Sequence, residues 1–324
     1  MDRIQVLDMI TGNREYIKLK SNIAFQNLAM LHKSFDSVED EECILSLALN
    51  DSIAALVFRA DYTGAISISQ SAIGRFPDTS HQFLIAGHEA VIGRCYTCLS
   101  QYDKAREHLY RADAIAFDRV EESEEARGLR ADIWHDLAMN NHHAGGSHAE
   151  TTGYLECALE ELEPAGQSIR RGVCLMGIGN VRFSEEKYKE ALSYYKKAVD
   201  PFEQKESYTN LAAVLSNIGL CYLNLKKPAE AEPHLMRSLD LRLRVGSYPE
   251  IANSYYNLSL LYKYNRNLSQ AYDTLLISRD YALVGQAKGI KLMILEDLAD
   301  IAQERGDTAA AETHQKQRLE IEGA

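Results

Sequence analysis

The chain has 324 residues, of which 46% are hydrophobic and 25% charged, and its formal net charge is −12. This composition can bury a large core, and the acidic balance argues against a nucleic-acid-binding protein, because neutralising phosphates requires a basic face. The amino terminus shows no secretion signal and the chain contains no window of about 18 apolar residues, so we expect a soluble, cytoplasmic protein with no membrane contact.

The segment 1–42 does not follow the pattern of the remaining chain, and we predict that it forms an amino-terminal helical extension. Its helical signal is a broad apolar stripe formed by Tyr16, Leu19, Ile23, Phe25, Leu28, Ala29 and Leu31. The segment that begins at Cys43 is predicted to form a helix with apolar residues on almost every side. Ala65 and Ala72 there anticipate Ala105 and Ala112 one repeat later. A repeat array over residues 43–324 is therefore expected.

A small residue recurs at one fixed interval at two places in the last four units. The first place holds Gly179, Gly219, Ser259 and Ala299, and the second holds Ala191, Ala231, Ala271 and Ala311. Stacked helix pairs must approach closely, and small residues at the crossings permit this, so we predict about seven helix–turn–helix units. The third unit is irregular, with a long glycine-bearing linker predicted over residues 140–151.

Turn chemistry agrees with this division into helices. Pro228 is placed at the start of a second helix, and Ser247 with Glu250 forms a capping box at the start of a first helix. Pro233 lies deeper in its helix, where a proline costs roughly 3 kcal/mol in a regular helix. A distorted first turn is expected there.

With these residues in place, the chain resembles the tetratricopeptide repeat family over about residues 45 to 324. The family pattern of apolar, small, aromatic and alanine places is met in full by Leu215, Ile218, Gly219, Tyr222, Ala231, Leu235 and Ser238. The proline that often ends a repeat is absent, and the period is 40 rather than about 34. Long units of this kind look like those of kinesin light chains, scaffolds that bind GoLoco-type peptides, and Rap-type regulators. The resemblance implies an all-α fold, a right-handed superhelix (α-α solenoid).

The resemblance also implies a concave wall formed by the first helix of each unit. Its residues in the last units are an expected peptide-binding site. Carboxamides can form hydrogen bonds with a peptide main chain, and apolar side chains exposed on such a wall are typical of a binding surface. The predicted site consists of Asn180, Phe183, Asn217, Leu220, Asn253, Tyr256, Asn257, Leu260 and Lys263. Solvated asparagines, or coverage by the amino-terminal helices or a second copy of the chain, explain the same residues without a peptide.

Other patterns carry less weight. His135, His142, His143 and His148 could bind a metal, but an exposed turn explains them without one. Cys95 and Cys98 have CxxC spacing, yet Cys95 and Cys221 share a place in their repeats, which indicates packing. Six scattered cysteines predict no disulfide framework. The dipeptide of His135 and Asp136 is too little to indicate a phosphohydrolase, and Gly177 and Gly179 follow no strand, so no nucleotide loop is expected.

We therefore expect a non-catalytic scaffold that binds a peptide or helix of a partner protein, with a regulatory role, no cofactor and no catalytic or metal site. Gln315 and Arg318 in the last helix predict a polar terminal cap. Homodimers are compatible with this reading. The alternative is the sensory module of a signalling enzyme, a cyclase or kinase, whose catalytic domain lies elsewhere.

Overall fold

The computed structural model describes residues 53, 56–57, 61–74, 82–117, 124–162, 168–245, 248–284 and 288–322. Every regular element in these ranges is a helix, and no strand occurs among them, which confirms the predicted all-α class. The extension predicted over residues 1–42 lies outside the described residues. The helices are α4 (Tyr62–Ile73), α5 (Gln82–Cys98), α6 (Tyr102–Phe117), α7 (Glu124–His143), α8 (His148–Leu162), α9 (Ser168–Ser184), α10 (Tyr188–Gln204), α11 (Tyr208–Asn224), α12 (Pro228–Val245), α13 (Tyr248–Tyr264), α14 (Leu268–Val284), α15 (Lys288–Glu304) and α16 (Thr308–Glu322).

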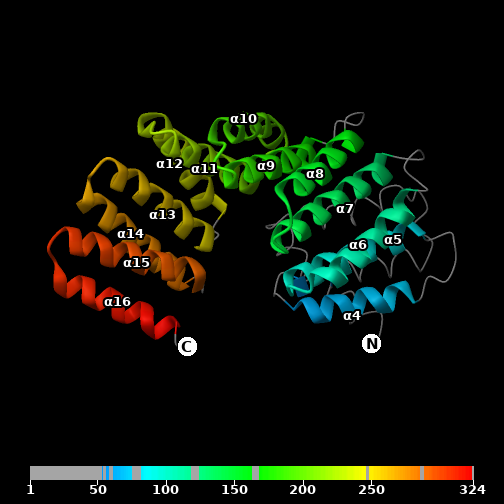
Figure 1. Cartoon of the computed structure of the whole chain (residues 1–324), viewed down its shortest axis with the longest axis horizontal. Helices are drawn as coiled ribbons and strands as arrows, with labels where there is room; N and C mark the ends of the chain where they lie inside the picture. Colours follow the sequence, from blue (N-terminus) through cyan, green and yellow to red (C-terminus); the bar gives the residue numbers. More distant parts are fainter. Residues whose placement is uncertain are drawn as a thin grey trace. The chain divides into compact units, whose positions relative to one another are not determined.

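The chain divides into two compact units, Met1–Val181 and Arg182–Ala324. In each unit, helices that follow one another in sequence pack together, as in the pairs α5–α6, α11–α12 and α13–α14 (Figure 1). First helices of successive repeats also contact each other, α5 with α7 and α11 with α13. Each unit is therefore a stack of helical hairpins, an α-α solenoid. The right-handed sense of coiling stays a prediction.

The repeat period appears directly in the helix boundaries. First helices begin at Ser168, Tyr208, Tyr248 and Lys288, and second helices begin at Tyr188, Pro228, Leu268 and Thr308. Each start therefore follows the equivalent one before it at the same interval as the small residues of the sequence. That spacing thus located the last four repeats without slippage.

Small residues lie where the two helices of a hairpin cross. A Cβ added to Gly219 of α11 would lie 2.5 Å from Leu235 Cδ2 of α12, and one added to Gly93 of α5 would lie 2.6 Å from Leu109 Cγ of α6. Real Cβ atoms do not approach carbon so closely, so both crossings require glycine unless the leucine moves. The leucine that fills the space over the glycine is itself almost fully buried in both hairpins.

The turns between helices share one backbone conformation. Glu186, Lys226 and Arg266, at equivalent places of three successive repeats, have φ values of 60°, 60° and 58°, and Gly306 continues the series at 78°. In the turn around Lys226, the amide of Lys227 donates to the Tyr222 carbonyl and that of Lys226 to the Leu223 carbonyl. This is the Schellman arrangement, which satisfies the last carbonyls of the helix by placing one residue in the left-handed region. Three of these four turns use a residue other than glycine there.

The linker of the third repeat is shorter than predicted. Helix α7 continues to His143 and α8 begins at His148, so only residues 144–147 connect them rather than residues 140–151. Gly145, with φ 74°, ends α7 in the same way as the other turns. Asn141 Nδ2 then donates to the Ser147 carbonyl and to Thr151 Oγ1, which ties the turn to the start of α8. Asn and His have low helix propensity, so the last residues of α7 resemble a linker in sequence, which explains the wrong prediction.

Proline is accommodated inside two helices. Pro228 is the first residue of α12, as predicted, because its missing N–H would have no partner at that place. Helix α12 runs from Pro228 to Val245 with Pro233 inside it, so the proline does not end the helix, and the distorted first turn stays a prediction. Pro201 likewise lies within α10. The capping residue predicted at Ser247 lies outside the described residues.

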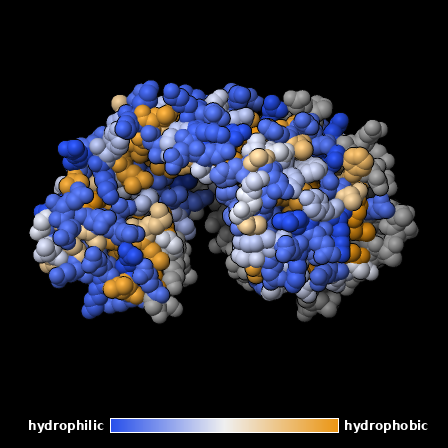
Figure 2. Space-filling view, viewed as in Figure 1, coloured by the Kyte–Doolittle hydropathy of each residue, from blue (hydrophilic) through white to orange (hydrophobic). Residues whose placement is uncertain are grey.

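The surface is mainly hydrophilic on the face shown in Figure 2, with apolar residues exposed in separate patches. None of the helices in the described part of the chain is both long enough and apolar enough to cross a lipid bilayer.

Candidate functional site

The candidate site is one face of the second unit, formed by the first helices α11, α13 and α15. Contacts join α11 to α13 and α13 to α15. Residues at equivalent places, spaced three or four apart, form a stripe along each helix on the side opposite its tightly packed places. We call this the first-helix face, and its residues are Asn217, Leu220, Asn253, Tyr256, Leu260, Lys263, Tyr264, Met293, Glu296, Asp300 and Glu304.

The predicted residues are not equally accessible. Asn253 is exposed, whereas Leu220 and Leu260 are half-buried on neighbouring helices, at the same place of two repeats. Both leucines pack against the core between α11, α12 and α13 and keep part of their surface outside it. Asn217 is also half-buried. The face therefore combines amide groups with partly exposed apolar side chains.

Two predicted residues lie near the division between the units. Asn180 belongs to the first unit and is exposed. Phe183 belongs to the second unit, and its ring contacts the edge of the Tyr188 ring at 5.2 Å between centroids. Peptide contact by either residue stays a prediction.

Asn257 has a different role from the one its sequence position indicates. Its side chain lies in the interface between α11 and α13, with only 5% of the residue exposed, and Nδ2 donates to Ser216 Oγ at 2.7 Å. A buried carboxamide needs such a partner, because leaving it unpaired costs about 1–3 kcal/mol. We therefore assign Asn257 to the joint between two repeats and not to the accessible part of the face.

The equivalent place of the next first helix, two positions before its small residue, holds a charged side chain in a similar arrangement. Asp297 of α15 accepts hydrogen bonds from Tyr256 Oη and Lys263 Nζ of α13, each at 2.9 Å. Burial and the nearby Asp297 carboxylate raise the pKa of Tyr256 above its ordinary value. For Lys263, burial opposes the charge, but the hydrogen bond to Asp297 and its negative charge outweigh burial and raise the pKa. Lys263 is therefore a fixed cation on this face, and the Tyr256 hydroxyl is held in place by the proton that it donates to Asp297.

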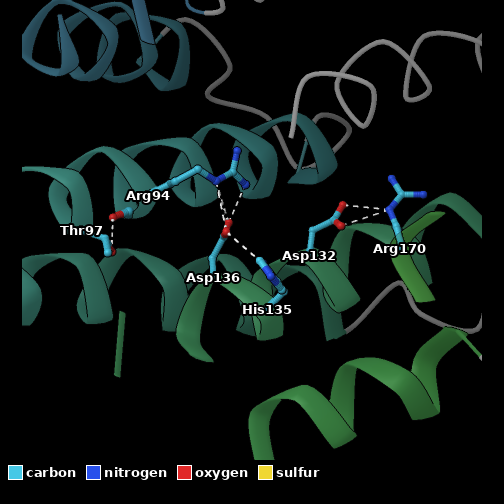
Figure 3. Close-up of polar contacts among 7 residues, drawn as sticks. Arg94, Thr97, Asp132, His135, Asp136 and Arg170 are labelled. Atoms are coloured by element: carbon cyan, nitrogen blue, oxygen red, sulfur yellow. Dashed lines mark hydrogen bonds and ion pairs between the residues drawn. The ribbon is translucent and has the colours of Figure 1, made fainter. Parts of the chain in front are cut away.

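The first unit has a corresponding set of charged residues that sequence analysis missed. Asp136 of α7 accepts from Arg94 Nε of α5 at 3.1 Å, and Asp132 of α7 accepts from Arg170 Nε of α9 at 3.0 Å (Figure 3). His135 Nδ1 lies 3.8 Å from Asp136. Three successive first helices are thus linked by ion pairs.

A sequence signal for this set was present. Asp136 and Asp297 occupy the same place relative to the small residues Ala138 and Ala299, two positions later. Both carboxylates accept from side chains of the preceding first helix. An acidic residue at this place therefore indicates a link between repeats.

The two carboxylates of this set titrate differently. Burial raises the pKa of Asp132 to about 6, against the opposing effect of Arg170 and with the help of the Asp136 charge. Burial also disfavours ionised Asp136, but Arg94 and His135 outweigh it and hold the pKa of Asp136 below its usual range. Asp136 therefore stays charged over the neutral range, whereas Asp132 can take up a proton in mildly acidic solution.

The histidine and cysteine patterns form no ligand set in the described part of the chain. His142 and His143 face each other edge to face at 5.7 Å between ring centroids, but no group of three His, Cys, Asp or Glu side chains is placed to hold a metal ion among the described residues. Cys95 is buried and Cys98 exposed. Burial raises the pKa of the Cys95 thiol to about 12, which leaves it protonated and a poor nucleophile.

Comparison with known proteins gives matches in both sequence and fold. Residues 210–275 match the family model described as Tetratricopeptide repeat. Tetratricopeptide repeat protein 16 of Homo sapiens is 26% identical over 149 residues, which cover 45% of this chain and 16% of that protein. The chain thus spans well under two thirds of this relative's length.

Two solved structures share the fold at low identity. A signal transduction ATPase with numerous domains from Pyrococcus horikoshii, which carries a tetratricopeptide repeat sensor, has a TM-score of 0.67 at 13% identity and is matched over 86% of this chain and 43% of its own. The apo form of RapI has a TM-score of 0.64 at 14% identity, over 84% of this chain and 95% of its own.

Proposed function

Because the chain is a tetratricopeptide repeat protein, we propose that it is a non-catalytic scaffold that binds a peptide segment of another protein on the first-helix face of its second unit. The observation that carries the proposal is the pair Leu220 and Leu260. They occupy the same place on neighbouring helices and keep part of their apolar surface accessible. Accessible apolar groups rimmed by polar residues are typical of protein-binding surfaces.

The polar groups around this pair suit the binding of a peptide main chain. The carboxamide of Asn253 is exposed and can both donate to a carbonyl and accept from an amide. Tyr256 and Lys263 are held in place by Asp297, so they lose little side-chain freedom when a partner binds. This preorganisation favours a binding role for the face.

A test uses peptides selected from a random-peptide display library on the purified protein. Leu220→Ala with Leu260→Ala is expected to weaken binding of the selected peptides by about tenfold or more, since tenfold corresponds to about 1.4 kcal/mol. The matched control is Met236→Ala with Ile277→Ala, which removes apolar groups 48% and 43% exposed on the second helices α12 and α14. Circular dichroism and urea unfolding establish that both variants fold. Selection of no specific peptide, or peptides that bind the α11/α13 variant as tightly as the parent, would contradict the proposal.

The likeness to the Pyrococcus horikoshii protein supports a second candidate function. That protein carries its tetratricopeptide repeats as a sensor in a longer signalling chain, of which the match covers 43%. In this candidate the array is the sensory module of a signalling enzyme. Sequencing the full transcript tests it, because an open reading frame without a cyclase, kinase or ATPase region would remove it.

A further inference from the structure

The carboxylates on α15 indicate the chemistry of the partner, in an inference that rests on the proposed function. We propose that the segment bound on the first-helix face is basic, and that its Lys or Arg side chains pair with Asp300 and Glu304. The apolar and amide groups of α11 and α13 then hold the same segment further along.

Glu296, Asp300 and Glu304 are spaced four positions apart and lie on one side of α15, and all three are exposed. Four positions along a helix correspond to about 6 Å. Alternate side chains of an extended peptide are separated by about 6.6 Å, and side chains one turn apart on a helix by about 6 Å. Basic side chains at alternate positions of an extended peptide, or one turn apart on a helix, therefore have the right spacing to pair with neighbouring carboxylates of α15.

Part of the negative charge on this helix is already paired. Asp297 accepts from Tyr256 and Lys263 of α13. Glu296 Oε1 lies 3.3 Å from Arg318 Nη1 of α16. These two carboxylates are therefore not fully available to a partner.

Asp300 and Glu304 differ, because neither forms a hydrogen bond or ion pair with other residues in the described ranges. The cations whose pKa values they help to raise are Lys263 and Arg318, and both of these are already paired with other carboxylates. Four carboxylates on α15 thus share two cations from the neighbouring helices. The end of the face keeps an excess of negative charge.

Apolar side chains lie on the same stripes as these carboxylates. Met293 of α15 is 50% exposed and Tyr264 of α13 is 43% exposed. A Lys or Arg side chain suits such a surface because its methylene stem covers apolar area while its charged end reaches a carboxylate. An aromatic ring can add a cation–π contact.

Charge complementarity favours one kind of partner for this face over a nucleic acid or a second copy of the chain. The net charge of the chain is −12, so an approaching nucleic acid meets repulsion. A second copy of the chain carries the same net charge of −12, so it also meets repulsion overall. A basic peptide is the occupant that gains from the charges.

The experiment repeats the peptide selection with charge variants. Asp300→Asn with Glu304→Gln removes two charges with little change in shape. The matched control, Glu232→Gln with Asp273→Asn, removes two exposed charges from the second helices α12 and α14. Peptides selected on the parent protein are expected to be enriched in Lys and Arg. Their binding should weaken about three- to tenfold in the α15 variant and remain unchanged in the control, as two exposed ion pairs predict.

The outcomes separate this inference from the proposed function. Raising the salt concentration should weaken binding to the parent and have a smaller effect on the α15 variant, because salt screens exposed ion pairs. Selected peptides without basic enrichment, or with equal affinity for the parent and the α15 variant, would overturn the basic partner. Peptide binding that depends on Leu220 and Leu260 would still stand in that case. Failure to select any specific peptide would overturn both.

Discussion

Asn257 Nδ2 of α13 donates a hydrogen bond to Ser216 Oγ of α11 at 2.7 Å, and this bond joins two successive repeats where their first helices meet. The two residues are separated by one repeat plus one position in sequence. The bond is buried, since 5% of Asn257 and 3% of Ser216 are exposed. It shows that the place two positions before the small residue of a first helix can belong to the interface between repeats.

The first prediction concerns this bond. Asn257→Ala leaves the Ser216 hydroxyl without its partner and creates a small cavity, so the free energy of unfolding should fall by about 1–3 kcal/mol. Asn253→Ala, one helical turn earlier and exposed, should change it by less than about 0.5 kcal/mol. Urea unfolding followed by circular dichroism measures both. Equal midpoints for the two variants would show that the buried bond contributes nothing.

The second prediction compares two glycines in helices. Gly219→Ala places a Cβ 2.5 Å from Leu235 Cδ2, and the resulting displacement should destabilise the protein by about 1–3 kcal/mol, partly offset by the better helix propensity of alanine. Gly289→Ala in α15 meets no atom within 4 Å, so only propensity acts there. It should stabilise by up to about 1 kcal/mol. Thermal unfolding of both variants should show shifts of opposite sign, and a stabilised Gly219→Ala variant would contradict the packing argument.

These crossings explain why much of the fold follows from the sequence. A glycine or alanine facing a leucine across a hairpin leaves a periodic trace, and the period places Gly219, Ala231 and their equivalents without knowledge of the contacts. The side-chain pairs between repeats leave a weaker trace, because no single residue type recurs at their place. Asn257 pairs with serine, Asp297 with tyrosine and lysine, and Asp136 with arginine, so one structural place uses three chemistries.

The turns were also hard to predict, for a different reason. Left-handed residues are usually identified from glycine, but Glu186, Lys226 and Arg266 hold this conformation. The Schellman hydrogen bonds and the fixed helix lengths impose it on whatever residue is present. For the candidate site, the sequence predicts a stripe of residues, but the burial of Asn257 and the pairing of Lys263 depend on contacts between helices that are distant in sequence.

The third prediction tests the strain in these turns. Arg266→Gly removes the cost of a left-handed conformation for a residue with a Cβ, which is about 1–2 kcal/mol. Glycine also loses more backbone entropy on folding, so a net gain of about 0.5–1 kcal/mol in unfolding free energy is expected. Gly306→Ala introduces the same strain in the next repeat and should destabilise by a similar amount. Calorimetric melting of the two variants decides the matter, and a destabilised Arg266→Gly variant would count against strain in the native turn.

The fourth prediction uses the raised pKa of Asp132. Because burial raises the folded-state pKa to about 6, above the ordinary value of 3.8, the folded protein binds a proton that the unfolded chain does not hold between these values. Stability from this group is therefore present at low pH and lost as pH rises through 6. Compared with Asp132→Asn, the parent should gain about 2 kcal/mol on going from pH 7 to pH 4.5. A constant difference in unfolding free energy across this range would show that the carboxyl group titrates normally.

The fifth prediction has the opposite sign and concerns His88 of α5. The residue is fully buried, and neither ring nitrogen has a hydrogen-bond partner among the described residues. Burial lowers its pKa from 6.5 to about 4, so the unfolded chain takes up a proton in this window while the folded protein does not. Stability from neutral His88 is complete above pH 6.5 and falls as the pH is lowered, by about 2 kcal/mol at pH 5.

His88→Leu removes both unpaired nitrogens at nearly constant volume, so at pH 7.5 the variant should be as stable as the parent or more stable. Its unfolding free energy should fall less than that of the parent between pH 7.5 and pH 5, by about 2 kcal/mol. Urea titrations at the two pH values measure this difference. His108, which pairs with Glu89 across the α5–α6 hairpin, provides the control, since His108→Leu leaves the buried His88 ring in place and should retain that part of the pH dependence. A His88→Leu variant that loses stability in acid as steeply as the parent would show that the ring is hydrated or hydrogen-bonded in the folded protein.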